Sequence, residues 1–152
     1  MATVELRFSA LPAHVRTARL VAAAVARRSG VDEAVLDEVR LAVGEACSRA
    51  VHLHRRHCPT TPVMVTLIDD EKGFSVAVAD EAPQGPPEAD DTLADLAASA
   101  DPASGDKGID LDRDAFMPEV GLAVISGLVE DVAIEPRDDG GVVVRMSWPI
   151  PA

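Results

Sequence analysis

Alternating apolar and polar residues at the start of the chain predict a strand with one buried face. In "TVELRFSA", Val4, Leu6 and Phe8 fall on one face, and Glu5 and Arg7 fall on the other. This two-residue period is typical of a half-buried strand.

Two helices are expected next. Pro12 opens the first, "PAHVRTARLVAAAVARRSG", and Gly30 ends it, which are positions that proline and glycine favour. Asp32 caps a second, longer helix, which runs to about His57 and is stopped by Pro59.

The second half of the chain predicts four strands and one helix. "TPVMVTLID" and "GFSVAVAD" are strands joined by the polar turn "DEKG". A short helix near Gly121, "GLAVISGLV", precedes the strands "EDVAIEP" and "GGVVVRMSWPI", which the turn "RDDGG" joins. This order predicts an α/β (α+β) fold: a two-layer sandwich of a mixed, mostly antiparallel sheet with helices on one face.

Between Asp80 and Pro118 the periodic pattern is lost. Such long loops inside a compact domain are uncommon, and they are usually lids, binding loops or disordered segments. The segment 81–118 holds ten acidic residues and two basic ones, and "DDTLADLAASA" within it has the pattern of a short amphipathic helix. This composition fits either a solvated acidic loop or a functional lid, and both alternatives stay open. We therefore expect one domain over residues 1–152, with a long acidic, lid-like loop at about 81–118.

The net charge of −12 argues against nucleic acid or an anionic membrane as the ligand, because phosphate groups select basic surfaces. Proteins with basic patches, or small molecules, are the more suitable partners.

The longest apolar run, "LVAAAVA", is far shorter than the roughly 20 residues that cross a bilayer, and "MATVELRFSA" is not a secretion signal. Cys47 and Cys58 are about 16 Å apart along the expected helix and cannot pair with each other. A reduced, cytoplasmic protein is the expectation.

Four segments in this order resemble the anti-sigma factor serine/threonine kinases of bacteria: "LRFSALPAHVRTARLVAAAVARRSG", "LDEVRLAVGEACSRAVHLH", "FSVAVADEAP" and "VGLAVISGLVEDVAIE". The likeness covers nearly the whole chain. It implies the ATPase fold shared by histidine-kinase catalytic domains, gyrase and Hsp90, with ATP and Mg²⁺ as cofactors. It also implies a partner-switching regulator that sequesters a sigma factor and releases it when an anti-anti-sigma protein competes. Active members phosphorylate a serine on that competitor, and members commonly form homodimers.

The family's first motif is a glutamate followed four residues later by an asparagine, both on one helix. Glu45 matches the glutamate, which by resemblance is the catalytic general base toward the hydroxyl that is phosphorylated. Arg49 stands where the family has the asparagine that holds Mg²⁺. A guanidinium has no acceptor atom and cannot bind a metal ion, so Arg49 makes Mg²⁺ binding doubtful.

The other two motifs also depart from the family pattern. Asp80 matches the aspartate that accepts the adenine amino group, but Ala82 and Gln84 stand at or near two expected glycines. Gly121 and Leu122 match the end of the glycine-rich turn whose helix faces the phosphates, where Glu119 adds a negative charge. Departures at three motifs predict that ATP with Mg²⁺ is bound weakly or not at all.

Three interpretations of Arg49 stay open. It places its own charge on the phosphates in place of Mg²⁺, or it pairs with Glu45 inside an empty pocket. The third is a solvent-facing helix pair with Glu45, one turn away, worth a few tenths of a kcal/mol.

The cluster "HLHRRHC" at residues 52–58 also has two interpretations. His54, His57 and Cys58 could share a face as zinc ligands, although zinc needs three or four ligands and only His14 lies elsewhere. Histidines favoured by the dipole at the end of a helix are the simpler explanation, so no metal site is assigned.

The leading hypothesis is an anti-sigma-factor-type regulator that acts by protein binding, with a degenerate ATP site and doubtful kinase activity. The first alternative is an active serine kinase with Glu45 as base and Arg49 in place of the metal. A further alternative is a non-catalytic sensory or structural domain that binds another ligand. The arginines of the first helix are candidate partner contacts, against the plainer possibility of a solvated face: Arg16, Arg19, Arg27 and Arg28.

Overall fold

A computed structural model describes residues 2–82, 118–138 and 140–151. The expected lid-like loop and its amphipathic segment therefore lie almost wholly outside the described residues. The elements, in chain order, are β1 (Ala2–Phe8), α1 (Pro12–Ser29), a 3₁₀ turn η1 (Glu33–Val35), α2 (Leu36–His57), β2 (Val63–Asp70), β3 (Gly73–Ala79), α5 (Pro118–Leu128), β4 (Asp131–Pro136) and β5 (Val142–Pro149).

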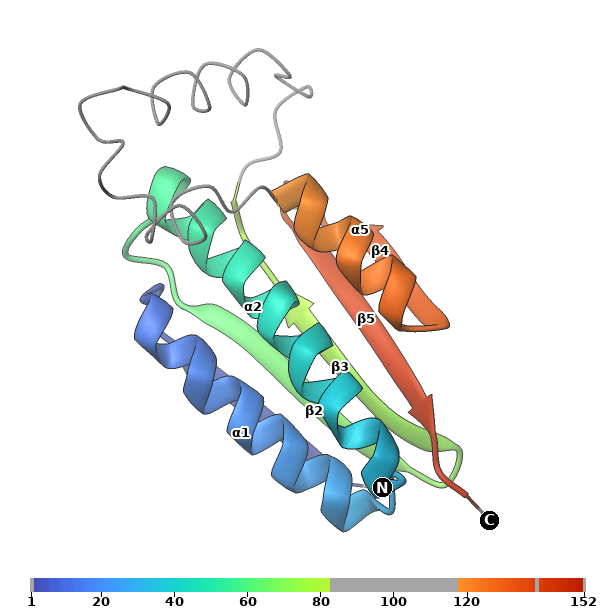
Figure 1. The fold of residues 1–152 in the computed structure, drawn as a ribbon. Helices are drawn as coiled ribbons and strands as arrows, with labels where there is room; N and C mark the ends of the chain where they lie inside the picture. The colour runs from blue at the N-terminus through green and yellow to red at the C-terminus, as the bar shows by residue number, and fades with distance from the viewer. Residues whose placement is uncertain (1, 83–117, 139, 152) are drawn as a thin grey trace, which may run out of the picture.

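The five strands form one sheet in the order β1-β2-β3-β5-β4, and each neighbouring pair is antiparallel. The three helices lie on one face of this sheet, with α2 between α1 and α5 (Figure 1). This is the two-layer sandwich that the sequence predicted, with its elements in the predicted order. The helix expected near Gly121 begins earlier, at Pro118. A proline suits a first helical position, because the N–H group that it lacks would have no partner within the helix.

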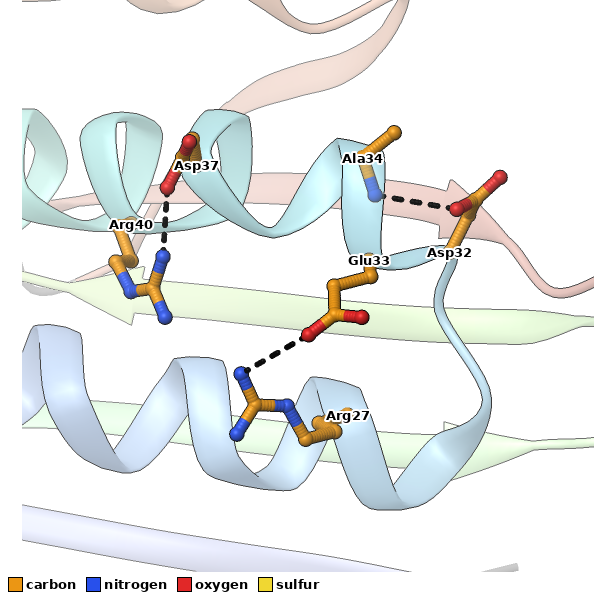
Figure 2. A network of polar contacts seen from close by, with 6 residues as sticks. All are labelled: Arg27, Asp32, Glu33, Ala34, Asp37 and Arg40. Carbon is orange, nitrogen blue, oxygen red and sulfur yellow. Dashed lines mark hydrogen bonds and ion pairs between the residues drawn. The ribbon is translucent and has the colours of Figure 1, made fainter.

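The first helix ends as the sequence predicted, whereas the second begins later than expected. Gly30 ends α1 in the left-handed conformation, with φ of 103°, and the N–H of Val31 returns to the carbonyl of Ala26. The carboxylate of Asp32 accepts from the N–H of Ala34 at 3.1 Å, which caps the 3₁₀ turn that leads directly into α2 (Figure 2). Asp32 was expected to cap the second helix and instead caps the 3₁₀ turn before it. The helix α2 begins at Leu36, and its N-cap residue, Val35, makes no side-chain cap.

The core lies between the sheet and the helices. The two helices α1 and α2 contact each other, and small residues make up much of their buried surface: Ala18, Ala22, Ala26, Ala42, Ala46 and Ala50. From the sheet come Phe74 and Trp148, whose rings stack with centroids 6.1 Å apart. The indole N–H of Trp148 donates to a carboxylate oxygen of Glu38 at 2.6 Å and so ties β5 to the start of α2.

Two arginines on the solvent side of the α1–α2 pair make ion pairs near the start of α2. Arg27 of α1 lies 3.7 Å from Glu33, and Arg40 lies 2.6 Å from Asp37 (Figure 2). These side chains are largely exposed apart from Arg40, which is 37% exposed, so each pair contributes well under about 1 kcal/mol. No helix in the described residues is both long and apolar enough to span a membrane.

Candidate functional site

The site residues predicted from the sequence lie on three elements. Glu45 and Arg49 belong to α2, Asp80 directly follows β3, and Ala82 comes two residues later. Gly121 and Leu122 belong to the first half of α5, which packs against α2. Leu122 is partly buried and packs on the hydrophobic core.

The structure brings Arg49 and Asp80 into direct contact. Nη1 of Arg49 donates to Oδ2 of Asp80 at 2.8 Å, and the two side chains are only 5% and 1% exposed. The other carboxylate oxygen, Oδ1, accepts from the N–H of Ala82 at 3.2 Å. The Nε atom of Arg49 is buried and has no hydrogen-bond partner. Asp80, which the sequence resemblance matches to an adenine-binding aspartate, is therefore paired with the chain's own guanidinium.

Two of the three interpretations of Arg49 are wrong. In the described part of the chain Arg49 pairs with Asp80 and not with Glu45, and its burial rules out a solvent-facing pair. The reason lies in the helix geometry. Arg49 belongs to a buried stripe of α2 together with Ala42 and Ala46, whereas Glu45 is only partly buried. The buried carboxylate of Asp80 needs a counterion more than the partly exposed carboxylate of Glu45 does, because a buried charge without a partner is costly.

Glu45 has no ion-pair partner among the described residues. Partial burial raises the pKa of its carboxyl, since desolvation disfavours the charged form. A carboxyl shifted in this direction is a better proton acceptor at neutral pH than an ordinary glutamate.

Two residues that the sequence analysis did not assign to the site hold the segment after β3 in place. His54 of α2 is fully buried, and its Nε2 accepts from the N–H of Glu81 at 2.9 Å. Gly141 comes so close that a Cβ atom there would lie 1.9 Å from the carbonyl oxygen of Asp80. The position of His54 in the apolar stripe with Cys47, Ala50 and Val51 was a signal for its burial. Nothing local distinguished Gly141 from an ordinary turn glycine.

The histidine-rich segment does not form a metal centre in the structure as described. No three His, Cys, Asp or Glu side chains among the described residues are grouped as metal ligands. Nδ1 of His54 lies 2.8 Å from the carbonyl oxygen of Thr61, so both of its ring nitrogens have protein partners. Cys47 is buried and Cys58 half-buried, and both are free thiols.

A cleft of about 710 Å³ lies at the opposite end of the sheet, beside the turn between β2 and β3. Glu38, Lys72, Glu130 and Trp148 are among the residues that line it. None of the site residues predicted from the sequence lines this cleft.

Comparison with known proteins identifies the family. The sequence pattern of the histidine kinase-like ATPase domain matches residues 8–148, so the chain belongs to this family. No curated protein sequence matches the chain. Among solved structures, the chain is similar to "The crystal structure of the RsbU and RsbW domains of Rv1364c from Mycobacterium tuberculosis", with 15% sequence identity and a TM-score of 0.62. The alignment covers 99% of this chain and 33% of that chain. At this identity the likeness shows the fold alone.

Proposed function

We propose that this protein is an anti-sigma-factor-type regulator that works by binding proteins in a partner-switching system, with a nucleotide pocket closed by its own arginine. The single observation that carries the loss of nucleotide binding is the buried ion pair between Arg49 and Asp80. The regulatory role itself rests on the sequence resemblance, with support from the family and from the fold.

ATP held in the family's manner does not fit these residues. Adenine would have to displace Arg49 from Asp80, and breaking a buried ion pair costs about 3–5 kcal/mol. That cost alone would weaken binding by a factor of about 10² to 10³ or more. Arg49 also offers no acceptor oxygen to Mg²⁺. We therefore derive no catalytic step through ATP or Mg²⁺ for the leading proposal.

The outer face of α1 is the proposed partner surface. This 18-residue helix has no acidic residue, although the chain as a whole carries 26. Its four arginines are exposed, as is Leu20 at 55%: Arg16, Arg19, Arg27 and Arg28. The stem of Arg19 lies over Gly44 of α2, where a Cβ atom would be only 2.6 Å from Cδ of the arginine. An acidic surface with an apolar centre on a sigma factor or its antagonist would complement this face.

A second candidate function is the serine kinase, which the raised pKa of Glu45 favours. In that case Glu45 is the base, and Arg49 leaves Asp80 on nucleotide binding and places its charge on the phosphates. A sensory or structural domain that binds another ligand is the third candidate. A pull-down with this protein as bait that recovers neither a sigma factor nor an antagonist would favour the third candidate.

Calorimetric titration with ATP separates these functions. We expect no heat at millimolar ATP, either with Mg²⁺ or with EDTA. Micromolar binding with Mg²⁺ would overturn the proposed closed pocket and favour the kinase, and binding that persists in EDTA would mean that Arg49 replaces the metal. Arg49→Asn should bind ATP more tightly than the wild type, because Asp80 is then free. Arg40→Asn replaces a partly exposed arginine on the same helix that does not contact Asp80, so it is the matched control and should leave ATP binding unchanged.

A further inference from the structure

We propose that two copies of this chain pair through the edge strand β1, antiparallel and centred on Leu6, so that their two sheets join into one. The partner at this edge is therefore a second copy of the chain. The proposal rests on β1 and its neighbours, and it depends neither on the proposed function nor on the state of the nucleotide pocket.

One side of β1 is an open sheet edge. The strand pairs only with β2, so the N–H and C=O groups along its other side have no partner strand in the sheet. Val4, Leu6 and Phe8 point toward the helix layer, because their partners on β2 belong to the core. Even so, Val4 is 37% exposed and the other two are only partly buried. An open edge that still presents apolar side chains is a template for another strand.

The sequence of β1 is complementary to itself when two copies run antiparallel. With Leu6 opposite Leu6 of the second copy, Glu5 lies opposite Arg7 of that copy, and Arg7 lies opposite its Glu5. On the other face, Val4 lies opposite Phe8 of the second copy on both sides of the Leu6 pair. Residues directly opposite each other share a face and have Cβ atoms about 5 Å apart. This register therefore brings unlike charges together on one face and apolar side chains together on the other.

Other registers of the same strand are unfavourable. A shift of two residues in one direction sets Glu5 against Glu5 of the second copy, and a shift in the other direction sets Arg7 against Arg7. A shift of one residue sets a charged side chain against an apolar one, because the side chains of a strand alternate between its faces. The charges thus specify one alignment.

The surroundings of β1 leave room for the second copy. Glu5 and Arg7 are exposed, and neither makes an ion pair within the described residues. The helix α1 packs mainly on β2 and β3, further into the sheet. In the joined sheet, β2 and its copy would be three strand spacings apart, or about 14 Å. A helix is about 10–12 Å across, so the two α1 helices fit beside each other.

The opposite edge of the sheet, β4, is protected against the same kind of pairing. Its two charged residues, Asp131 and Glu135, are both acidic, so two copies of β4 would bring like charges together. The strand also ends in Pro136, which has no N–H group to donate. β1 carries no proline and has charges of both signs. Pairing of β1 with β1 obeys a two-fold axis, so it closes at two copies.

Sedimentation equilibrium tests the pairing through its charges. Glu5→Arg and Arg7→Glu each place two like-charge pairs in the interface, so each variant should raise the dissociation constant of the dimer by about ten- to a hundredfold. An equimolar mixture of the two variants should form dimers again, because each variant supplies the charges that the other lacks. Asp131→Arg makes the same change of charge as Glu5→Arg on the edge β4, and it should leave the dissociation constant unchanged.

Disulfide cross-linking tests the register. In a Cys58→Ser background, where the remaining native thiol, Cys47, is buried, mild oxidation should link two copies of Leu6→Cys, because residue 6 lies opposite itself. Val4→Cys is the matched control. In the proposed register this position is four residues, or roughly 13 Å, from its own copy, which is beyond disulfide reach, so it should stay unlinked.

Three results would overturn the proposal. The first is a wild-type protein that sediments as a monomer up to millimolar concentration, and the second is a mixture of Glu5→Arg and Arg7→Glu that sediments as monomers. The third is assembly that grows beyond the dimer with concentration, because β1 would then pair with β4 in an open chain. Linking of Val4→Cys in preference to Leu6→Cys would refute the register.

Discussion

Substituting Arg49 should destabilise the protein far more than substituting a surface arginine, because it leaves a buried carboxylate without its counterion. Arg49→Met keeps an unbranched chain of similar reach but removes the charge. The remaining bond to Asp80, from the N–H of Ala82, leaves its Oδ2 unpaired among the described contacts. Removing one partner of a buried pair costs about 3–5 kcal/mol, so both Arg49→Met and Asp80→Asn should lose about that much.

The double variant makes the test specific. When both charges are removed, the desolvation penalty disappears, so Arg49→Met with Asp80→Asn should be no less stable than the worse single variant. Urea unfolding followed by the fluorescence of Trp148 suits the measurement, because it is the chain's one tryptophan and is only 3% exposed. With an m-value of about 2 kcal/mol per molar urea, each single variant should lower the midpoint by about 1.5–2.5 M.

Arg40→Met is the matched control for the ion pair. Arg40 pairs with the exposed Asp37 on the same helix, so its loss should cost no more than about 0.5 kcal/mol. The reasoning would be refuted if Arg49→Met unfolded within about 1 kcal/mol of the wild type, or if the two single losses simply added in the double variant.

Three further outcomes are expected. Gly141→Ala should strongly destabilise the fold in thermal unfolding, because the added methyl group would meet the backbone of Asp80. Gly127→Ala in α5 adds a methyl group with nothing within 4 Å and should stabilise the fold by up to about 1 kcal/mol, so equal effects of the two variants would contradict this. Glu45→Gln should be more stable than the wild type at pH 8, because ionising a carboxyl whose pKa the fold raises opposes folding. The urea midpoints of the variant and the wild type should converge toward pH 4, and a difference that stays constant with pH would count against the raised pKa. Cys47, whose pKa burial raises to about 12, should resist Ellman's reagent in the native protein and react only after unfolding; prompt native labelling in a Cys58→Ser background would show that it is accessible.

The fold was largely predictable because its elements carry strong local signals. Gly30 ends the first helix as predicted, and Asp32 caps the 3₁₀ turn just before the second. The alternation in β1 is confirmed for Leu6 and Phe8, which are partly buried, but Val4 is 37% exposed on this edge strand. Strand order is a different matter, because the order β1-β2-β3-β5-β4 depends on contacts between distant segments. Periodicity predicts each strand but carries no information on which strands are neighbours, so the sequence analysis made no prediction of this order.

The site was predicted less completely, because its contacts join residues far apart in sequence. The sequence correctly made Arg49 the unusual position, but spacing of four residues favoured Glu45 as its partner. The real partner, Asp80, is 31 residues away, and burial determines that choice. The close approach of Gly141 to Asp80 likewise depends on how β3 and β5 pair at their ends, which no local pattern reports.

Both ends of the chain lie at the β2–β3 turn, away from Asp80 (Figure 1). Ala2 pairs with Asp69, Pro149 pairs with Gly73, and three strand spacings of about 4.8 Å put β1 and β5 roughly 14 Å apart. About six linker residues could therefore join the two ends, and a circular permutant opened between β2 and β3 should reach the same folded structure. It would fold more slowly, because cutting this turn converts the pairing of two neighbouring strands into contact between opposite ends of the chain.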